Sequence, residues 1–86
     1  MTNRDIAIAT AVIMSTLLEC DWAPRSIVQM ALAEKWVCFR DVHIFNQFCG
    51  VLEGMGWIKV SAERLTLTDD GRIKAQEFEA MRMVGE

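Results

Sequence analysis

The chain has 86 residues, of which 52% are apolar and 24% are charged. This length allows a single domain over residues 1–86, and the apolar share excludes an intrinsically disordered chain. With a formal net charge of −3, the molecule as a whole is no polycation, so any contact with nucleic acid requires a local basic patch.

A first helix is predicted to begin at Thr2, because Thr2 and Asp5 have the spacing of a capping box. Its core face is expected to carry Ile6, Ala9, Ile13, Leu17 and Cys20, widened by Met14 and Leu18. Ile8 and Val12 lie on another face of this helix. The sequence leaves three alternatives open for these two residues. The C-terminal helix could cover them, a second copy of the chain could cover them, or they could be exposed to solvent.

A second helix is expected from about Pro24 to about Lys35, because proline lacks an amide proton and suits the first turn of a helix. Its apolar positions at helical spacing are Ile27, Met30 and Ala31, with Val28 and Leu32 beside them. Residues 36–39 then form an irregular connector of bulky and β-branched side chains.

Asp41 is a suitable N-cap for a third helix, which is predicted over residues 42–54. Its core stripe is expected to contain Phe45, Phe48, Leu52 and Met55, with Cys49 at the edge. The opposite arc carries His43, Asn46, Gln47, Gly50 and Glu53. Gly54 and Gly56 are expected to close the helix, since glycine adopts the left-handed conformation at low cost.

The hydrophobic period then changes from that of a helix to that of a strand, and residues 57–60 and 65–68 are predicted to form a two-stranded hairpin. Thr68 or Asp69 is expected to cap a last helix over about residues 70–83. Ile73, Phe78 and Met81 are available for its packing.

The three cysteines, Cys20, Cys38 and Cys49, contain no C-x-x-C pair, which argues against a disulfide framework and a local zinc site. We expect reduced, structural thiols in a cytoplasmic protein without metal or cofactor. His43 and Cys49 lie on different faces of one helix, so we expect no nucleophilic pair and no enzyme. Residues 6–18 are too short to span a bilayer, and we expect no membrane contact.

Two passages of the sequence carry a resemblance to a known fold. Residues 52–58 (LEGMGWI) resemble the passage by which winged helix-turn-helix domains leave the recognition helix, and residues 65–72 (LTLTDDGR) resemble the passage that leaves the wing. The second passage is common in MarR-like and PadR-like regulators. Three helices, a two-stranded wing and a C-terminal helix, in this order, resemble the same mainly α fold.

The resemblance implies a small DNA-binding transcription regulator, with the third helix as recognition helix and the hairpin as wing. The residues that it implies for base contacts are His43, Asn46, Gln47 and Gly50, of which Asn and Gln can bind an adenine edge with two hydrogen bonds. The residues that it implies for phosphate contacts are Arg25, Arg40, Lys59 and Arg64.

The outward face of the third helix has no Lys or Arg, which predicts weak or salt-sensitive DNA binding unless dimerisation doubles the contacts. We therefore expect a homodimer, because two-fold dimers are the commonest assembly. The residues expected at its interface are Ile8, Val12, Phe78 and Met81.

An alternative partner is a host protein, bound by a phage-encoded or mobile-element protein that inhibits a nucleic-acid-handling complex. Trp36, Phe39 and Glu53 would then be the sensitive positions, since buried aromatics commonly carry interface energy. Trp22 and Trp57 are expected to pack in the core, and Trp36 with Phe39 to be the exception. A metal- or redox-sensing role of the cysteines is the third alternative.

Overall fold

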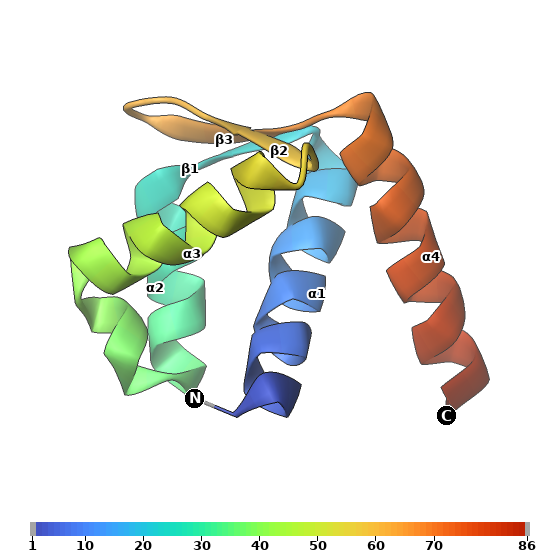
Figure 1. Ribbon diagram of the computed structural model, residues 1–86, viewed down its shortest axis with the longest axis horizontal. Coiled ribbons are helices and arrows are strands. Elements are labelled where there is room, and N and C mark those ends of the chain that lie inside the picture. The colour runs from blue at the N-terminus through green and yellow to red at the C-terminus, as the bar shows by residue number, and fades with distance from the viewer. Residues whose placement is uncertain (1, 86) are drawn as a thin grey trace.

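The computed structural model describes residues 2–85, and the side chains of residues 2–81. This part of the chain is mainly helical, with a small antiparallel sheet across one end of the helices (Figure 1). The elements are α1 (Asn3–Cys20), β1 (Trp22–Pro24), α2 (Arg25–Lys35), the 3-10 turn η1 (Val37–Arg40), α3 (Val42–Gly54), β2 (Ile58–Val60), β3 (Arg64–Leu67) and α4 (Asp69–Gly85).

The helix caps predicted at Thr2 and at Asp41 are both present. The Asp5 amide donates to the Thr2 hydroxyl at 3.1 Å and the Thr2 amide donates to the Asp5 carboxylate at 3.2 Å, which confirms the capping box. Asp41 accepts from the His43 amide at 2.8 Å, and α3 has the predicted bounds.

Asp21 ends α1 in a left-handed conformation with a φ of 66°, and its carboxylate pairs with Arg72.

The sheet has three strands in the order β1-β3-β2, so the expectation of only a two-stranded hairpin is wrong. The predicted hairpin is present as β2 and β3, with Ile58 opposite Leu67. β1 adds to its other edge, with Trp22 opposite Thr66. Pro24 ends this strand instead of lying in the first turn of α2, and the strand exists only because β3, far along the sequence, pairs with it.

The core lies where α1, α2, α3 and the inner face of the sheet meet, and α4 packs along α1 (Figure 1). The buried apolar side chains of this core are those of Ala9, Ile13, Met14, Leu17, Ala23, Val28, Leu32, Phe39, Phe45, Cys49, Leu52, Ile58, Leu65, Leu67 and Ala75. Most of the predicted stripes of α1 and α3 are thus confirmed, whereas Phe48 is only partly buried.

Several residues expected in the core are exposed instead. On α2 the core residues are Val28 and Leu32, while Ile27, Met30 and Ala31 face outward. Both arcs of this helix carry apolar side chains, so the packing of α2 against its neighbours decides between them. Further residues that the sequence predicted to pack inside are also exposed, namely Ile6 and Cys20 of α1, Met55 after α3 and Ile73 of α4.

The connector before α3 is the 3-10 turn η1, and Phe39 at its centre is fully buried. Its ring meets those of Trp36, Phe45 and Phe48 edge to face, with centroid distances of 6.2, 6.4 and 5.3 Å. The expectation that Phe39 faces a partner is therefore wrong. Trp36 is partly buried against the same core.

Thr68, directly after β3, forms hydrogen bonds both with the turn before β2 and with the first turn of α4. Its hydroxyl donates to the Gly56 carbonyl at 2.6 Å and accepts from the Gly71 amide at 2.9 Å, so Thr68 is the N-cap of α4. A Cβ at Gly71 would lie 1.8 Å from the Trp57 carbonyl oxygen, so only glycine fits here. Gly56, with a φ of 80°, makes the turn after α3, whereas Gly54 needs no positive φ.

Candidate functional site

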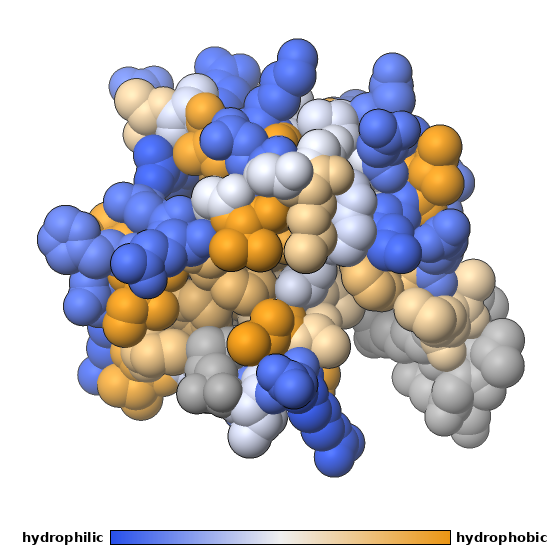
Figure 2. All heavy atoms as spheres, viewed as in Figure 1, coloured by the Kyte–Doolittle hydropathy of each residue, from blue (hydrophilic) through white to orange (hydrophobic). Residues whose placement is uncertain are grey.

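The outward face of α3 presents the polar residues that the sequence singled out. His43, Asn46, Gln47 and Gly50 are all exposed on this face. A Cβ built at Gly50 meets no atom within 4 Å, so the backbone there borders open space. Hydrophilic side chains gather around the N-terminal half of α3 and over the hairpin (Figure 2). A ligand can therefore approach the backbone of α3 closely at Gly50.

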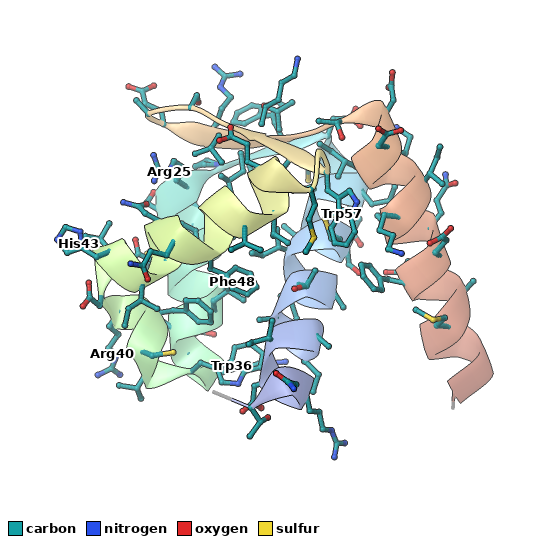
Figure 3. The ribbon with its side chains drawn as sticks, in the orientation of Figure 1. Arg25, Trp36, Arg40, His43, Phe48 and Trp57 are labelled. Carbon is teal, nitrogen blue, oxygen red and sulfur yellow. The ribbon has the colours of Figure 1, made fainter. Side chains whose placement is uncertain are left out.

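Arg25, the first residue of α2, reaches this face and joins it to the hairpin (Figure 3). Its Nη2 donates to Oδ1 of Asn46, and its Nη1 donates to the Ser61 carbonyl oxygen at 2.9 Å. Its backbone amide donates to the Glu63 carbonyl oxygen at 3.0 Å. One side chain thus contacts both α3 and the turn between β2 and β3.

Further hydrogen bonds hold the hairpin against α3. The Glu53 carboxylate accepts from the Val60 amide at 3.0 Å. Within the turn, the Ser61 hydroxyl donates to the Arg64 carbonyl oxygen at 3.0 Å and accepts from the Arg64 amide at 3.1 Å. The bond from Val60 to Glu53 joins β2 to α3, whereas the two bonds between Ser61 and Arg64 fix the shape of the turn itself.

Lys59 and Arg64 lie on the outer face of the sheet. Leu65 and Leu67 point into the core, so Arg64 and Thr66 point outward, and Lys59 is opposite Thr66. The Arg64 guanidinium carbon lies 4.6 Å from the centre of the Trp22 ring, a cation–π contact. Trp22 is 46% exposed there, so the expectation that it packs in the core is wrong.

The predicted cations do not form one continuous stripe on the α3 face. Arg25 contacts α3 through Asn46, whereas Arg40 of η1 lines a separate shallow groove with Met30, Ala33 and Glu34 of α2. Lys59 and Arg64 are added by the adjoining sheet. The acidic residues Asp41, Glu53 and Glu63 are exposed within the same region. The surface is thus mixed in charge, as the composition of the chain predicts.

The cysteines are all free thiols in different environments: Cys20 is exposed, Cys38 is half-buried and Cys49 is buried. Burial raises the pKa of Cys49 to about 11, against a smaller opposing effect of the Arg25 charge. His43 is exposed on a different face of the same helix. The two side chains therefore do not form a nucleophile and base pair. Among the side chains of residues 2–81, no three His, Cys, Asp or Glu groups converge as metal ligands.

Two grooves flank α4. One, of about 420 Å³, brings together three of the four residues predicted for a dimer interface, Ile8, Val12 and Phe78; its other lining residues are Ala11, Ser15, Thr16 and Lys35. The fourth, Met81, is 60% exposed and lies outside the lining. α4 thus covers Ile8 and Val12 only in part.

The second groove, of about 360 Å³, lies between α1, α3 and α4 and is almost entirely apolar (Figure 2). Exposed residues in its lining are Ile6, Val51 and Met55, and the partly buried ones include Phe48, Trp57 and Phe78. The sequence pattern placed several of these residues in the core, and the surplus of apolar residues was the only signal that an open surface would remain. In the described part of the chain, no helix is long and apolar enough to cross a membrane.

Comparisons of the chain with models of protein families, with curated proteins and with solved structures found no match.

Proposed function

We propose that the chain is a winged helix-turn-helix domain that binds duplex DNA as a small transcription regulator. In this proposal α3 lies in the major groove, and the β2–β3 hairpin is the wing beside it. The order of helices and hairpin supports the resemblance of the two sequence passages. A fold alone carries no function, so the argument rests on the surface that α3 and the wing share.

The single observation that carries the proposal is the bridge that Arg25 makes between α3 and the wing. Asn46 and Ser61 accept hydrogen bonds from the same guanidinium, so the polar face of α3 and the wing turn form one connected surface. Arg25 also adds a positive charge to this surface, because α3 itself contains no Lys or Arg. An exposed face with Asn, Gln and His beside a bound Arg fits contacts to base edges better than contacts to an apolar partner.

Arg40, Lys59 and Arg64 supply the phosphate contacts in this proposal. Asp41, Glu53 and Glu63 reduce the local positive potential, so the affinity is expected to be modest and to fall steeply with salt. Two copies of the surface on one duplex would compensate, because paired half-sites double the number of contacts.

A homodimer is the assembly that this proposal requires. The groove lined by Ile8, Val12 and Phe78 gathers predicted interface residues from α1 and α4 on one side of the molecule. Such a patch can meet its own copy across a two-fold axis. The dimer would hold two α3 helices in fixed relation to one another, as paired half-sites demand.

The test measures binding of a mixed-sequence duplex by fluorescence anisotropy at about 50 mM salt, where phosphate contacts are strong. The protein should bind, and the double variant Lys59→Ala and Arg64→Ala should bind all sequences more weakly. Arg4→Ala removes an exposed cation from the first turn of α1, outside α3, the wing and the groove of the proposed dimer, and serves as the control. Equal affinities of the wing variant and the control would reject the proposed role of the wing.

A second candidate function, recognition of another protein, is favoured by the apolar groove between α1, α3 and α4. Val51 is 58% exposed and Met55 is 54% exposed at its rim. Of the three residues predicted to contact a protein partner, Phe39 is buried and cannot do so. Trp36 is partly accessible, and Glu53 is exposed. Under this alternative, duplex affinity is negligible at low salt, and Val51→Asp with Met55→Asp abolishes biological activity.

A further inference from the structure

The orientation of the Asn46 side chain is determined by Arg25. An arginine guanidinium carries donors only, so the amide atom that it contacts is the oxygen, Oδ1. The amide nitrogen Nδ2 is then directed away from Arg25, and it makes no hydrogen bond within the described residues. Because Asn46 is exposed, this nitrogen offers its two N–H groups to a ligand.

Arg25 is itself held in place and retains donors of its own. Of the five N–H groups of its guanidinium, one is directed to Ser61 and one to Asn46. Its backbone hydrogen bond to Glu63 fixes the start of α2 against the wing turn. The Arg25–Asn46 pair therefore presents a cluster of donors in which the one acceptor atom, Oδ1, is already engaged.

Guanine and adenine present different hydrogen-bonding groups to such a cluster of donors. In the major groove guanine presents two adjacent acceptors, O6 and N7, whereas adenine presents the acceptor N7 beside the donor N6. Oδ1 of Asn46 has a second lone pair, but a donor that approached it would meet the positively charged N–H groups of Arg25 at the same oxygen. The usual pairing of Asn with adenine is therefore disfavoured at this position.

We propose that the Arg25–Asn46 pair selects guanine over adenine, with Arg25 as the positioning residue that turns the amide nitrogen of Asn46 toward the base. This inference rests on the proposed function, since it requires α3 to lie in the major groove. It changes the expected role of both residues. Asn46 reads an acceptor edge instead of adenine, and Arg25 acts on a base contact instead of a phosphate alone.

The experiment uses the full chain and duplexes chosen by selection from a randomised pool. Anisotropy titrations then compare the selected duplex with single-base versions that carry adenine or 7-deazaguanine in place of each guanine. We expect one guanine per half-site at which adenine weakens binding about tenfold and at which removal of N7 also weakens it. No preference for guanine, or equal binding of 7-deazaguanine at every position, would overturn the proposal in favour of contacts to phosphate.

Variants separate positioning from a merely structural role. Arg25→Met removes every side-chain donor at this position and so frees Oδ1 of Asn46. The preference should then move from guanine toward adenine. A structural role would instead weaken both duplexes alike. Asn46→Asp keeps a partner for Arg25 but replaces the donor by an acceptor, so the ratio of the affinity for the guanine duplex to that for the adenine duplex should fall to one or below. Asn46 is exposed, so this second variant tests the proposal even if Arg25→Met fails to fold.

The outcomes also separate this inference from the proposed function. If no duplex binds at low salt, the proposed function fails, and the inference fails with it. If duplexes bind with a steep salt dependence but with an unchanged preference in Asn46→Asp, DNA binding is supported and the guanine contact is rejected.

Discussion

The rings of Phe39 and Phe48 meet edge to face with their centres 5.3 Å apart, and this contact packs η1 against the helix that follows it. Phe39 is fully buried, and Phe48 points toward α1 (Figure 3). The aromatic cluster therefore sets the angle at which α3 leaves the connector, and with it the direction of the polar face.

Replacement of Phe39 by alanine should reduce the free energy of unfolding by about 3–5 kcal/mol, because it removes a fully buried ring and leaves a cavity. Urea denaturation measures the loss. Val37→Ala, at a position that is 69% exposed two residues earlier, is the control and should change the stability by less than about 0.5 kcal/mol. Equal effects of the two changes would show that Phe39 is no core residue.

Gly50→Ala separates stability from ligand binding. Alanine in a helix interior is more stable than glycine by about 0.5–1 kcal/mol, and the added Cβ meets nothing in the protein. The variant should therefore unfold at a higher temperature and yet bind duplex DNA more weakly, because the Cβ lies on the face that approaches the bases.

Gly54→Ala is the matched control for this change. It also adds a Cβ into open space, at the last residue of α3. Its duplex affinity should remain that of the unmodified protein. If Gly50→Ala and Gly54→Ala bind equally well, the outward face of α3 does not lie close to the ligand.

The sequence predicted the elements whose signals are local. The capping residues Thr2 and Asp41 marked the starts of α1 and α3, and Gly56 marked the turn after α3. β1 gave no such signal, because a three-residue strand that ends in Pro24 depends on its pairing with β3. The apolar positions predicted for α2 were Ile27, Met30 and Ala31 with Val28 and Leu32 beside them, and only the last two are buried. Helical spacing cannot rank two apolar arcs that tertiary packing distinguishes.

For the candidate site, the sequence identified which residues face outward but not how they are joined. Asn46 and Gly50 were placed on the exposed arc from the helical period alone. The contact between Arg25 and Asn46 spans 21 positions and depends on how α2 and the turn between β2 and β3 meet α3. The apolar groove at Val51 and Met55 was missed for a similar reason, since α4 packs along α1 without covering it.

The stability of the protein should decline in alkaline solution, in part through Cys49. Burial raises the pKa of its thiol from 9.0 to about 11, so the folded state holds the proton more tightly than the unfolded state does. This contribution is fully present below pH 9 and is lost as the pH rises through about 11.

Urea denaturation below pH 9 and near pH 11, with the unmodified chain and Cys49→Ala, isolates the effect of this thiol. Lysines also titrate in this range, so the difference between the two proteins is the informative quantity. The stability of the unmodified chain should fall more steeply with pH. Parallel declines would show that the Cys49 thiol has the same pKa in the folded and unfolded states.

The dimer predicted at the groove of Ile8, Val12 and Phe78 should be disrupted by Ile8→Glu, which places a charge in an apolar contact. Sedimentation velocity at micromolar concentration should find a dimer for the unmodified chain and a monomer for the variant. Ile27→Glu makes the same change on the outer face of α2, at a residue that is 56% exposed, and should leave the dimer intact. A monomeric unmodified chain would reject the assembly.

Binding of a mixed-sequence duplex as a function of salt concentration tests the central claim most directly. Arg40, Lys59 and Arg64 are the proposed phosphate contacts of each protomer, and each neutralised phosphate contributes about −0.9 to the slope of log K against log salt. We predict measurable binding at about 50 mM salt and a slope of about −3 per protomer. The absence of binding at this salt concentration, or a slope near zero, would contradict DNA binding by this surface.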